Sequence, residues 1–340
     1  MLDIESSSPY RALNRLRDTV PLAFMEQSNT GLAAAPAVLL QPAPRRSSGG
    51  RDAVEAYGFL APALVVLAVF LLGPAIWVFW LSLYKWDLIA QNPDFVGLDN
   101  FRILLTHDTN FRKALLQTVY YVGASVPLGI ALGLGIALLL NRRLRGRGLM
   151  RSAIFAPYVM PIVAVAIIWG WMLNPDFGVI NAALKSLHLP TLQWLQSSRT
   201  VMPSIILFGL WQHVGYNTVI FLAGLSNIPP DLEEAARVDG ARPWWIFWRI
   251  TWPLLSPTTY FVLLISMIAS FKVLVPVLVL VGNSGGPDNA AQTIGVYLYN
   301  QAFSSFHAGY AGAISVVLFV IILAITLLQT RVFSRRVFYQ

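Results

Sequence analysis

Six long apolar stretches constrain this chain more than any other feature of its sequence. Four contain no charged residue, and each of the other two contains a single basic side chain, His213 or Lys272. A helix that crosses the hydrocarbon of a bilayer needs about 20 mostly apolar residues, and only helices and closed barrels satisfy their backbone hydrogen bonds there. The stretches are residues 57–84, 114–140, 152–174, 201–230, 252–282 and 309–330. We therefore predict an all-α membrane protein with six transmembrane helices.

Composition also favours a membrane chain. Of the 340 residues, 56% are hydrophobic and only 12% are charged, whereas about a quarter of the residues in a typical soluble domain are charged. The net charge of +8 does not indicate nucleic-acid binding, because the basic residues cluster between the apolar stretches instead of forming a basic face with interleaved aromatics. The chain has no cysteine, which excludes disulfides, zinc–thiolate sites, iron–sulfur clusters and a cysteine nucleophile.

Arginines between the stretches predict the orientation of the chain, because Lys and Arg accumulate on the cytoplasmic side of a membrane. With the N-terminus inside, the loops at residues 141–151 and 229–251 and the end of the chain are cytoplasmic. These segments carry Arg142, Arg143, Arg145, Arg147, Arg151, Arg237, Arg242, Arg249, Arg331, Arg335 and Arg336. The opposite segment 284–307 has no Lys or Arg. Both termini are therefore predicted to be cytoplasmic.

Residues 1–52 differ from the rest of the chain. They mix charged, proline and small residues without a sustained period, a composition that does not support a packed core. We predict a disordered cytoplasmic tail at residues 1–52 and a six-helix domain at residues 53–340. An amphipathic docking helix at residues 11–17 is the alternative for part of this tail.

A helix–turn–helix pattern precedes the fifth apolar stretch. Asp231 is placed to cap a helix, with Glu234 three residues later as in a capping box. Gly240 suits the left-handed conformation that ends such a helix, and Pro243 suits the first turn of a second one. The second helix carries a concentration of large apolar residues, namely Trp244, Trp245, Phe247, Trp248, Ile250 and Trp252. We therefore expect it to lie in the membrane interface or against a partner.

The spacing in this segment resembles the EAA loop of the permease subunits of binding-protein-dependent ABC importers. The shared pattern runs from Glu234-Ala235-Ala236 through Gly240 to Ile250 and Pro253, and Trp252 stands where the family pattern has leucine. Three further segments extend the resemblance toward the carbohydrate-uptake branch: residues 96–101 (VGLDNF), 285–287 (GGP) and 309–311 (GYA). The resemblance covers residues 57–336 and excludes the N-terminal tail.

The resemblance implies the type I ABC importer permease fold in the bacterial cytoplasmic (inner) membrane, as a multi-pass subunit in the lipid bilayer. Its implied partners are a second homologous permease, two cytoplasmic ATPase subunits and an extracytoplasmic solute-binding protein. ATP and Mg would bind to the ATPase subunits, and this chain would need no cofactor. The loop at residues 229–253 would dock on an ATPase subunit and couple ATP hydrolysis to transport. The coupling residues implied are Asp231, Glu233, Glu234, Ala235, Ala236, Asp239, Gly240, Ala241, Ile250 and Pro253.

Other classes of membrane protein fit the sequence less well. No Gly-x-x-x-x-Gly-Lys-Ser/Thr motif occurs, so we expect no ATP-binding phosphate loop in this chain. An intramembrane enzyme needs paired carboxylates, clustered metal ligands or a nucleophile beside its base, and the apolar stretches contain none of these. A secondary transporter or channel usually needs ionisable residues within its spans, and only His213 and Lys272 are present. We expect a transport subunit with no catalytic residue, no metal site and no nucleic-acid partner.

In the resembled family the solute passes between the two permeases, along the fourth and fifth spans. The polar and aromatic candidates there are Gln212, Tyr216, Asn217, Ser270, Phe271 and Lys272. Gln212 and Tyr216 are one helical turn apart and are expected to share a face, while Phe271 is expected to stack on the solute beside Ser270 or Lys272. The alternative is that these groups only join helices, with Lys272 snorkelling to the interface. The expected solute is a sugar or sugar-like molecule. Glycerol-3-phosphate or a glycerophosphodiester is the alternative, because a phosphate would favour a cationic group.

Overall fold

The computed structural model describes residues 50–87, 92–142 and 145–333. It separates into two compact units, Met1–Ala68 and Val69–Gln340. The described part of the first unit is helix α3 (Gly50–Leu67), which begins three residues before the predicted domain boundary at residue 53, together with Ala68. The predicted tail up to residue 49, its alternative docking helix, and Arg143, Arg335 and Arg336 lie outside the described residues.

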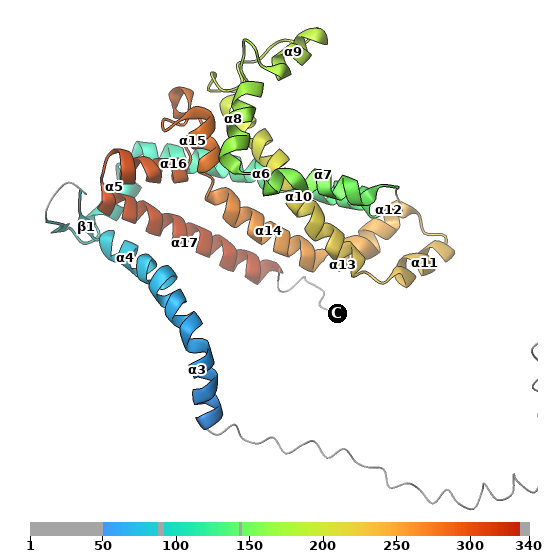
Figure 1. Cartoon of the computed structure of the whole chain (residues 1–340), viewed down its shortest axis with the longest axis horizontal. Helices are drawn as coiled ribbons and strands as arrows, with labels where there is room; N and C mark the ends of the chain where they lie inside the picture. The colour runs from blue at the N-terminus through green and yellow to red at the C-terminus, as the bar shows by residue number, and fades with distance from the viewer. Residues whose placement is uncertain (1–49, 88–91, 143–144, 334–340) are drawn as a thin grey trace, which may run out of the picture. The chain divides into compact units, whose positions relative to one another are not determined.

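Most of the described residues of the second unit lie in helices (Figure 1). The longer ones are α4 (Gly73–Leu81), α5 (Asp99–Thr106), α6 (Thr109–Leu140), α7 (Arg147–Val159), α8 (Ile162–Met172), α9 (Val179–Ser186), α10 (Val201–Ser226), α11 (Pro230–Val238), α14 (Ser256–Phe271), α15 (Val275–Val281) and α17 (Ala308–Phe333). The shorter ones are η1 (Ala68–Leu72), α12 (Pro243–Ile246), η2 (Phe247–Thr251), α13 (Trp252–Leu254), η3 (Pro287–Asn289), α16 (Ile294–Tyr299) and η4 (Asn300–Ser304). Two short strands, β1 (Tyr84–Lys85) and β2 (Asp94–Phe95), pair antiparallel with Tyr84 opposite Phe95.

Four helices in the described chain are long and apolar enough to cross a membrane: Tyr57–Leu81, Thr109–Leu140, Val201–Ser226 and Ala308–Val332. They correspond to the first, second, fourth and sixth predicted spans. Two bent pairs raise the number to six if each pair is one span: Arg147–Val159 with Ile162–Met172, bent by 97°, and Pro243–Leu254 with Ser256–Phe271, bent by 65°. The described residues therefore hold four to six candidate spans.

The third predicted span, residues 152–174, is not one continuous helix. α7 ends at Val159 and α8 begins at Ile162, with Met160 between them in an extended conformation (φ −68°, ψ 146°). Pro161 accounts for the break, because proline has no N–H to donate and disfavours the helical conformation in the residue before it. α8 accordingly leaves the direction of α7 (Figure 1).

The fifth predicted span, residues 252–282, is also wrong as a single helix. α14 ends at Phe271, α15 begins at Val275, and Leu274 between them is non-helical (φ −139°, ψ −65°). The ring of a proline in a helix clashes with the carbonyl four residues earlier, and for Pro276 that carbonyl belongs to Lys272. Lys272 is therefore the C-cap residue of α14.

The ends of α6, α10 and α17 meet the start of α14 at one end of the second unit. Leu140, Leu225 and Leu255 are buried in one apolar cluster, and the hydroxyls of Tyr260 and Thr330 lie 2.8 Å apart. The ends of the predicted cytoplasmic loops and the end of α17 thus share one side of this unit.

Asp108 ties three helices together at the opposite end. It caps α6, because its Oδ1 accepts a hydrogen bond of 2.9 Å from the backbone N–H of Phe111. Its Oδ2 accepts from the hydroxyl of Tyr297 on α16 at 2.6 Å and from that of Tyr310 on α17. Burial favours the protonated acid, but the hydrogen bonds to the carboxylate outweigh burial and lower the pKa of Asp108 from its ordinary value.

α10 is the central helix of this unit and contacts α6, α7, α14 and α15. Its neighbours approach closely at positions that lack a side chain. A Cβ at Gly215 would collide with the backbone carbonyl of Ile154 on α7, and a Cβ at Gly224 would collide with the side chain of Thr258 on α14. Small residues at helix crossings are the usual means of close packing in membranes, so these contacts fix how α7 and α14 lie against α10.

Candidate functional site

The first helix of the helix–turn–helix segment starts differently from the prediction. Pro229 is the N-cap residue of α11, Pro230 fills the first helical position, and no side chain caps the helix. Asp231 is therefore inside the first turn, and the predicted capping box with Glu234 is not formed. The helix starts two residues earlier than expected, because the fixed φ of proline suits the first position. Asp231 and Glu233 still lie in the first turn, where the helix dipole favours acids.

The end of α11 follows the prediction. Gly240 has φ +78°, the N–H of Ala241 donates to the carbonyl of Ala236 at 2.9 Å, and the N–H of Gly240 donates to that of Arg237 at 3.0 Å. These two bonds form the Schellman motif, which satisfies carbonyls that the helix end leaves free. Pro243 then occupies the first turn of α12, as expected. The turn between the two helices is thus closed by its own backbone.

Glu233 braces the two helices of this segment against each other. Its Oε2 accepts a hydrogen bond of 2.9 Å from Arg237 within α11, and its Oε1 accepts one of 3.3 Å from the hydroxyl of Thr251 in η2. Thr251 is buried, so its hydrogen bond to Glu233 joins α11 to a buried residue of η2 on the other side of the turn. The resemblance implied Glu233 as a coupling residue, but Thr251 was not predicted, because no local pattern joins residues on opposite sides of a turn.

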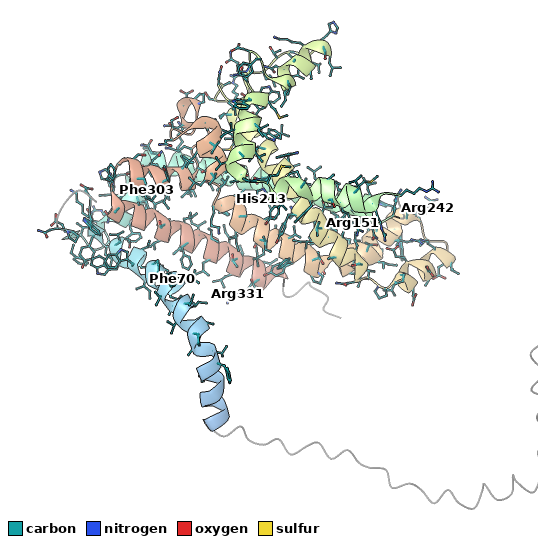
Figure 2. All side chains as sticks on the ribbon, in the orientation of Figure 1. Phe70, Arg151, His213, Arg242, Phe303 and Arg331 are labelled. Atoms are coloured by element: carbon teal, nitrogen blue, oxygen red, sulfur yellow. The ribbon has the colours of Figure 1, made fainter. Side chains whose placement is uncertain are left out.

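A groove of about 640 Å³ lies between α11 and the second helix. Six of the residues implied by the resemblance line it: Ala235, Ala236, Asp239, Gly240, Ala241 and Ile250. Leu232, Arg242 and Trp245 complete the lining, and Arg242 projects away from the helices (Figure 2). Asp231, Glu233 and Glu234 lie elsewhere on α11, and Pro253 lies in α13. We call residues 229–253 the coupling loop, after the role that the resemblance implies for them.

A second hollow, of about 380 Å³, lies where α6, α7, α10 and α14 meet; we call it the central cavity. It brings together four of the six predicted solute-path residues, namely Tyr216, Asn217, Ser270 and Lys272. Asn217 is also packed into the α6–α10 crossing, where a Cβ on Gly133 would lie 2.8 Å from its own Cβ. Asn217 therefore has the position expected for both predicted roles: it lines the cavity, and it packs between two helices.

Gln212 and Phe271 do not line the central cavity. The face of α10 that does so carries Gly209, His213 and Tyr216, at the i, i+4, i+7 spacing of one helical stripe. Gln212 lies one residue off that stripe and is buried. Phe271 is buried in the apolar cluster that includes Phe111 of α6, because its ring is better accommodated in the core than in a polar hollow.

Three aromatic residues of the cavity wall, Tyr121, Tyr158 and His213, were not among the predicted solute-path residues. The rings of Tyr158 on α7 and Tyr216 on α10 stack, with centroids 4.6 Å apart and planes inclined by 20°. His213 meets Tyr158 edge to face at 5.9 Å, and its Nδ1–H donates to the carbonyl of Gly209 at 3.0 Å. Figure 2 labels His213 close to the bend between α7 and α8. Pro161 is the signal that could have found Tyr158, because the break that it causes brings this end of α7 to the cavity.

The central cavity is polar at scattered points and otherwise apolar. Hydroxyls line it at Tyr121, Ser125, Ser266 and Ser270, and the Oγ atoms of Ser125 and Ser270 lie 3.4 Å apart across α6 and α14. Lys272 is the one Lys or Arg residue among the described lining residues. Among the described residues, no group of three or more His, Cys, Asp or Glu side chains could hold a metal ion. Such a cavity can bind a polar solute by stacking and hydrogen bonds.

The described residues thus form a helical protein with four to six candidate membrane spans, a groove at the helix–turn–helix segment and a central cavity. Residues 111–339 match the model of a family described as the binding-protein-dependent transport system inner membrane component. The chain belongs to this family. It is a non-catalytic, multi-pass inner-membrane permease subunit of a bacterial ABC importer.

Relatives along most of the chain carry related names. The chain is 35% identical to the probable ABC transporter permease YesP of Bacillus subtilis, over 85% of this chain and 94% of that protein. It is 34% identical to the trehalose/maltose permease MalF of Thermococcus litoralis, over 83% and 94%. It is 32% identical to the sn-glycerol-3-phosphate permease UgpA of Yersinia enterocolitica, over 84% and 95%.

The fold has a counterpart among solved structures. A chain of a bacterial alginate ABC transporter, in complex with an alginate pentasaccharide-bound periplasmic protein, superimposes with a TM-score of 0.72 at 25% identity. The match covers 83% of this chain and 94% of that one.

Proposed function

We propose that this permease forms, with a second homologous permease, the path by which a sugar or sugar-like solute crosses the membrane. The observation that carries the proposal is the central cavity, in which the stacked rings of Tyr158 and Tyr216 face hydroxyl and amide groups. Aromatic faces and uncharged hydrogen-bonding groups suit a sugar. The names of the relatives, which include trehalose/maltose and alginate transport systems, support the same class of solute.

The partners follow from the same proposal. An extracytoplasmic solute-binding protein delivers the solute, and the alginate transporter complexed with its periplasmic protein supports this arrangement. Two cytoplasmic ATPase subunits bind ATP and Mg, and the coupling loop docks on one of them. The exposed rings of Trp244, Trp245 and Trp248 give this loop an apolar surface that suits an interface. Asp231, Glu234 and Pro253 belong to this proposed coupling set, together with the residues of the groove and of the Glu233 brace.

We propose the six-span topology with both termini in the cytoplasm. The support is the arginine content of residues 141–151 and 229–251, which share one side of the second unit with the end of α17. Because the chain has no cysteine, single cysteines at Gly146 and Asn289 can be labelled with a membrane-impermeant maleimide. We expect labelling from opposite sides, and labelling of both from the same side would refute the topology.

The role of the central cavity is tested by removing the tyrosine stack. Tyr158→Leu should lower solute uptake by the reconstituted transporter about fivefold, because a stacked aromatic contact contributes about 1 kcal/mol. Basal ATPase activity and assembly should be unchanged. Tyr120→Leu is the matched control, since Tyr120 is exposed on α6 and does not line the cavity. Equal uptake by both variants at limiting solute would remove the cavity from the path.

A second candidate solute is glycerol-3-phosphate or a glycerophosphodiester, carried by the same mechanism. The observation in its favour is Lys272, which lines the central cavity. The 32% identity to the glycerol-3-phosphate permease UgpA supports it as well.

A further inference from the structure

The central cavity has an unbalanced charge. Its described lining contains Lys272 and no Asp, Glu or Arg. No ion pair or side-chain hydrogen bond joins Lys272 to another group in the part of the chain that the structure describes. Lys272 is an exposed residue that lines the cavity, so an anion that entered the cavity would meet a positive charge that no described carboxylate of the lining neutralises.

The position of Lys272 is fixed by the backbone. Pro276 ends α14 at this residue, and the backbone N–H of Lys272 donates to the carbonyl of Ala269 at 3.2 Å. A cation at the C-terminal end of a helix is favoured by the helix dipole, which gives Lys272 a structural reason to exist. The helix dipole explains why a cation is stable at this position. It does not explain why the side chain of Lys272 lines the cavity.

The surroundings of Lys272 favour the binding of an anion. Apolar residues such as Val273, Leu274 and Ile265 form much of the wall, and a low-dielectric wall weakens the screening of a charge by water. The hydroxyls of Ser270 and Ser266 lie in the same wall and can donate to anionic oxygens. A carboxylate that would repel such a solute is absent from the described lining.

We propose that the central cavity selects a solute that carries a carboxylate or phosphate group, with its anionic oxygens at the ammonium of Lys272 and its sugar-like body on the Tyr158–Tyr216 stack. This proposal rests on the proposed function, because it assigns the class of solute to the same cavity. An acidic sugar and a phosphorylated polyol share this chemistry, and separate probes distinguish them.

The charge of the cavity can be measured without transport. A Ser270→Cys variant of the assembled transporter places a thiol in the cavity wall, and the chain has no other cysteine. Its rates of reaction with an anionic sulfonatoethyl and a cationic trimethylammonioethyl methanethiosulfonate report the local potential. Adding Lys272→Gln should lower the anionic-to-cationic rate ratio about tenfold, as expected for a nearby charge in a partly screened site. Adding Lys272→Arg should leave the ratio unchanged, and an equal ratio in all three proteins would overturn the proposal.

Protection of the same thiol tests the class of solute. Glucuronate or sn-glycerol-3-phosphate should slow labelling of Ser270→Cys by an uncharged maleimide, whereas glucose and glycerol should protect much less. Protection by glucuronate alone indicates an acidic sugar, and protection by sn-glycerol-3-phosphate alone indicates a phosphorylated solute. Equal protection by neutral and anionic probes would refute charge selection but leave the cavity as the solute path. Absence of protection by any probe would count against both the proposed function and this inference.

Discussion

The coupling loop and the central cavity are built in opposite ways. In the coupling loop the described hydrogen bonds are local: the Schellman bonds span a single turn, and the bond from Thr251 to Glu233 joins residues 18 apart. In the central cavity the described lining comes from six helices, α6, α7, α8, α10, α14 and α15, and the contact between Ser125 and Ser270 joins residues 145 apart.

Because the two regions are built differently, different substitutions should disrupt them. The coupling loop depends on the backbone conformation of one residue, Gly240, which has no atom within 4 Å of where a Cβ would lie. The central cavity depends on the distance between helices, which glycines such as Gly215 set. The coupling loop should therefore be sensitive to substitutions that disfavour a positive φ at Gly240. The central cavity should be sensitive to substitutions that add side-chain volume where helices meet.

The largest effect is expected from a volume change at the α7–α10 contact. In Gly215→Ala the added methyl would collide with the carbonyl of Ile154, and forced overpacking costs about 2 kcal/mol. Because α7 carries Tyr158, the variant should lose thermal stability in detergent and separate the Tyr158–Tyr216 stack. Gly135→Ala is the matched control, since nothing lies within 4 Å of its Cβ position. Equal melting temperatures for the two variants would show that α7 can shift without cost.

A change in backbone conformation at Gly240 should have the next largest effect. In Gly240→Val a β-branched residue would have to adopt φ +78°, and the left-handed region costs an L-residue about 1–2 kcal/mol. We expect normal insertion but several-fold less solute uptake per ATP hydrolysed. Gly240→Asn is the control, because Asn tolerates the left-handed conformation better than other side chains. If the Val and Asn variants couple equally well, the turn geometry is not what the loop requires.

The smallest effect concerns Asp108, a polar cluster assembled at long range like the cavity. The pKa of Asp108 is lowered from 3.8 in the folded protein, so its contribution to stability is complete above that value and is lost as the pH falls through the folded pKa. The advantage in melting temperature of the wild type over Asp108→Asn should be constant down to about pH 5 and shrink at lower pH. Asp94→Asn, at an exposed position on β2, provides the control. A difference that persists unchanged at pH 3 would mean that the hydrogen bonds of Asp108 do not depend on its charge.

The same contrast explains what could be predicted from the sequence. Gly240 and Pro243 act through their own backbone preferences, so their roles in the coupling loop were predicted from residue type and spacing alone. Pro230 carries the same kind of signal, and the capping role assigned to Asp231 was wrong because that proline starts α11 two residues earlier. The backbone preferences of neighbouring residues predict the ends of these helices when all of the residues around each end, Pro230 included, are considered.

The central cavity could be predicted only in part. Hydropathy located the six apolar stretches but did not show that Pro161 and Pro276 break two of them, because proline is also tolerated inside a membrane helix, as Pro127 is in α6. The placement of Phe271 in the core and of Tyr158 in the cavity wall depends on which helices meet. That information lies in the packing of distant segments and not in the spacing of residues along one helix.

The glycine contacts of α10 also bear on the order in which the chain is made. α6 and α7 leave the ribosome before α10, so their contacts with α10 at Asn217 and Gly215 can form while the rest of the chain is still being synthesised. The contact between Gly224 and Thr258 of α14 has to wait for residues that follow. A chain truncated after Ser226 should therefore already form a cysteine cross-link between α7 and α10, and its absence would mean that α14 is needed to bring the earlier helices together. On this order of events, α10 is the surface on which the second half of the permease assembles.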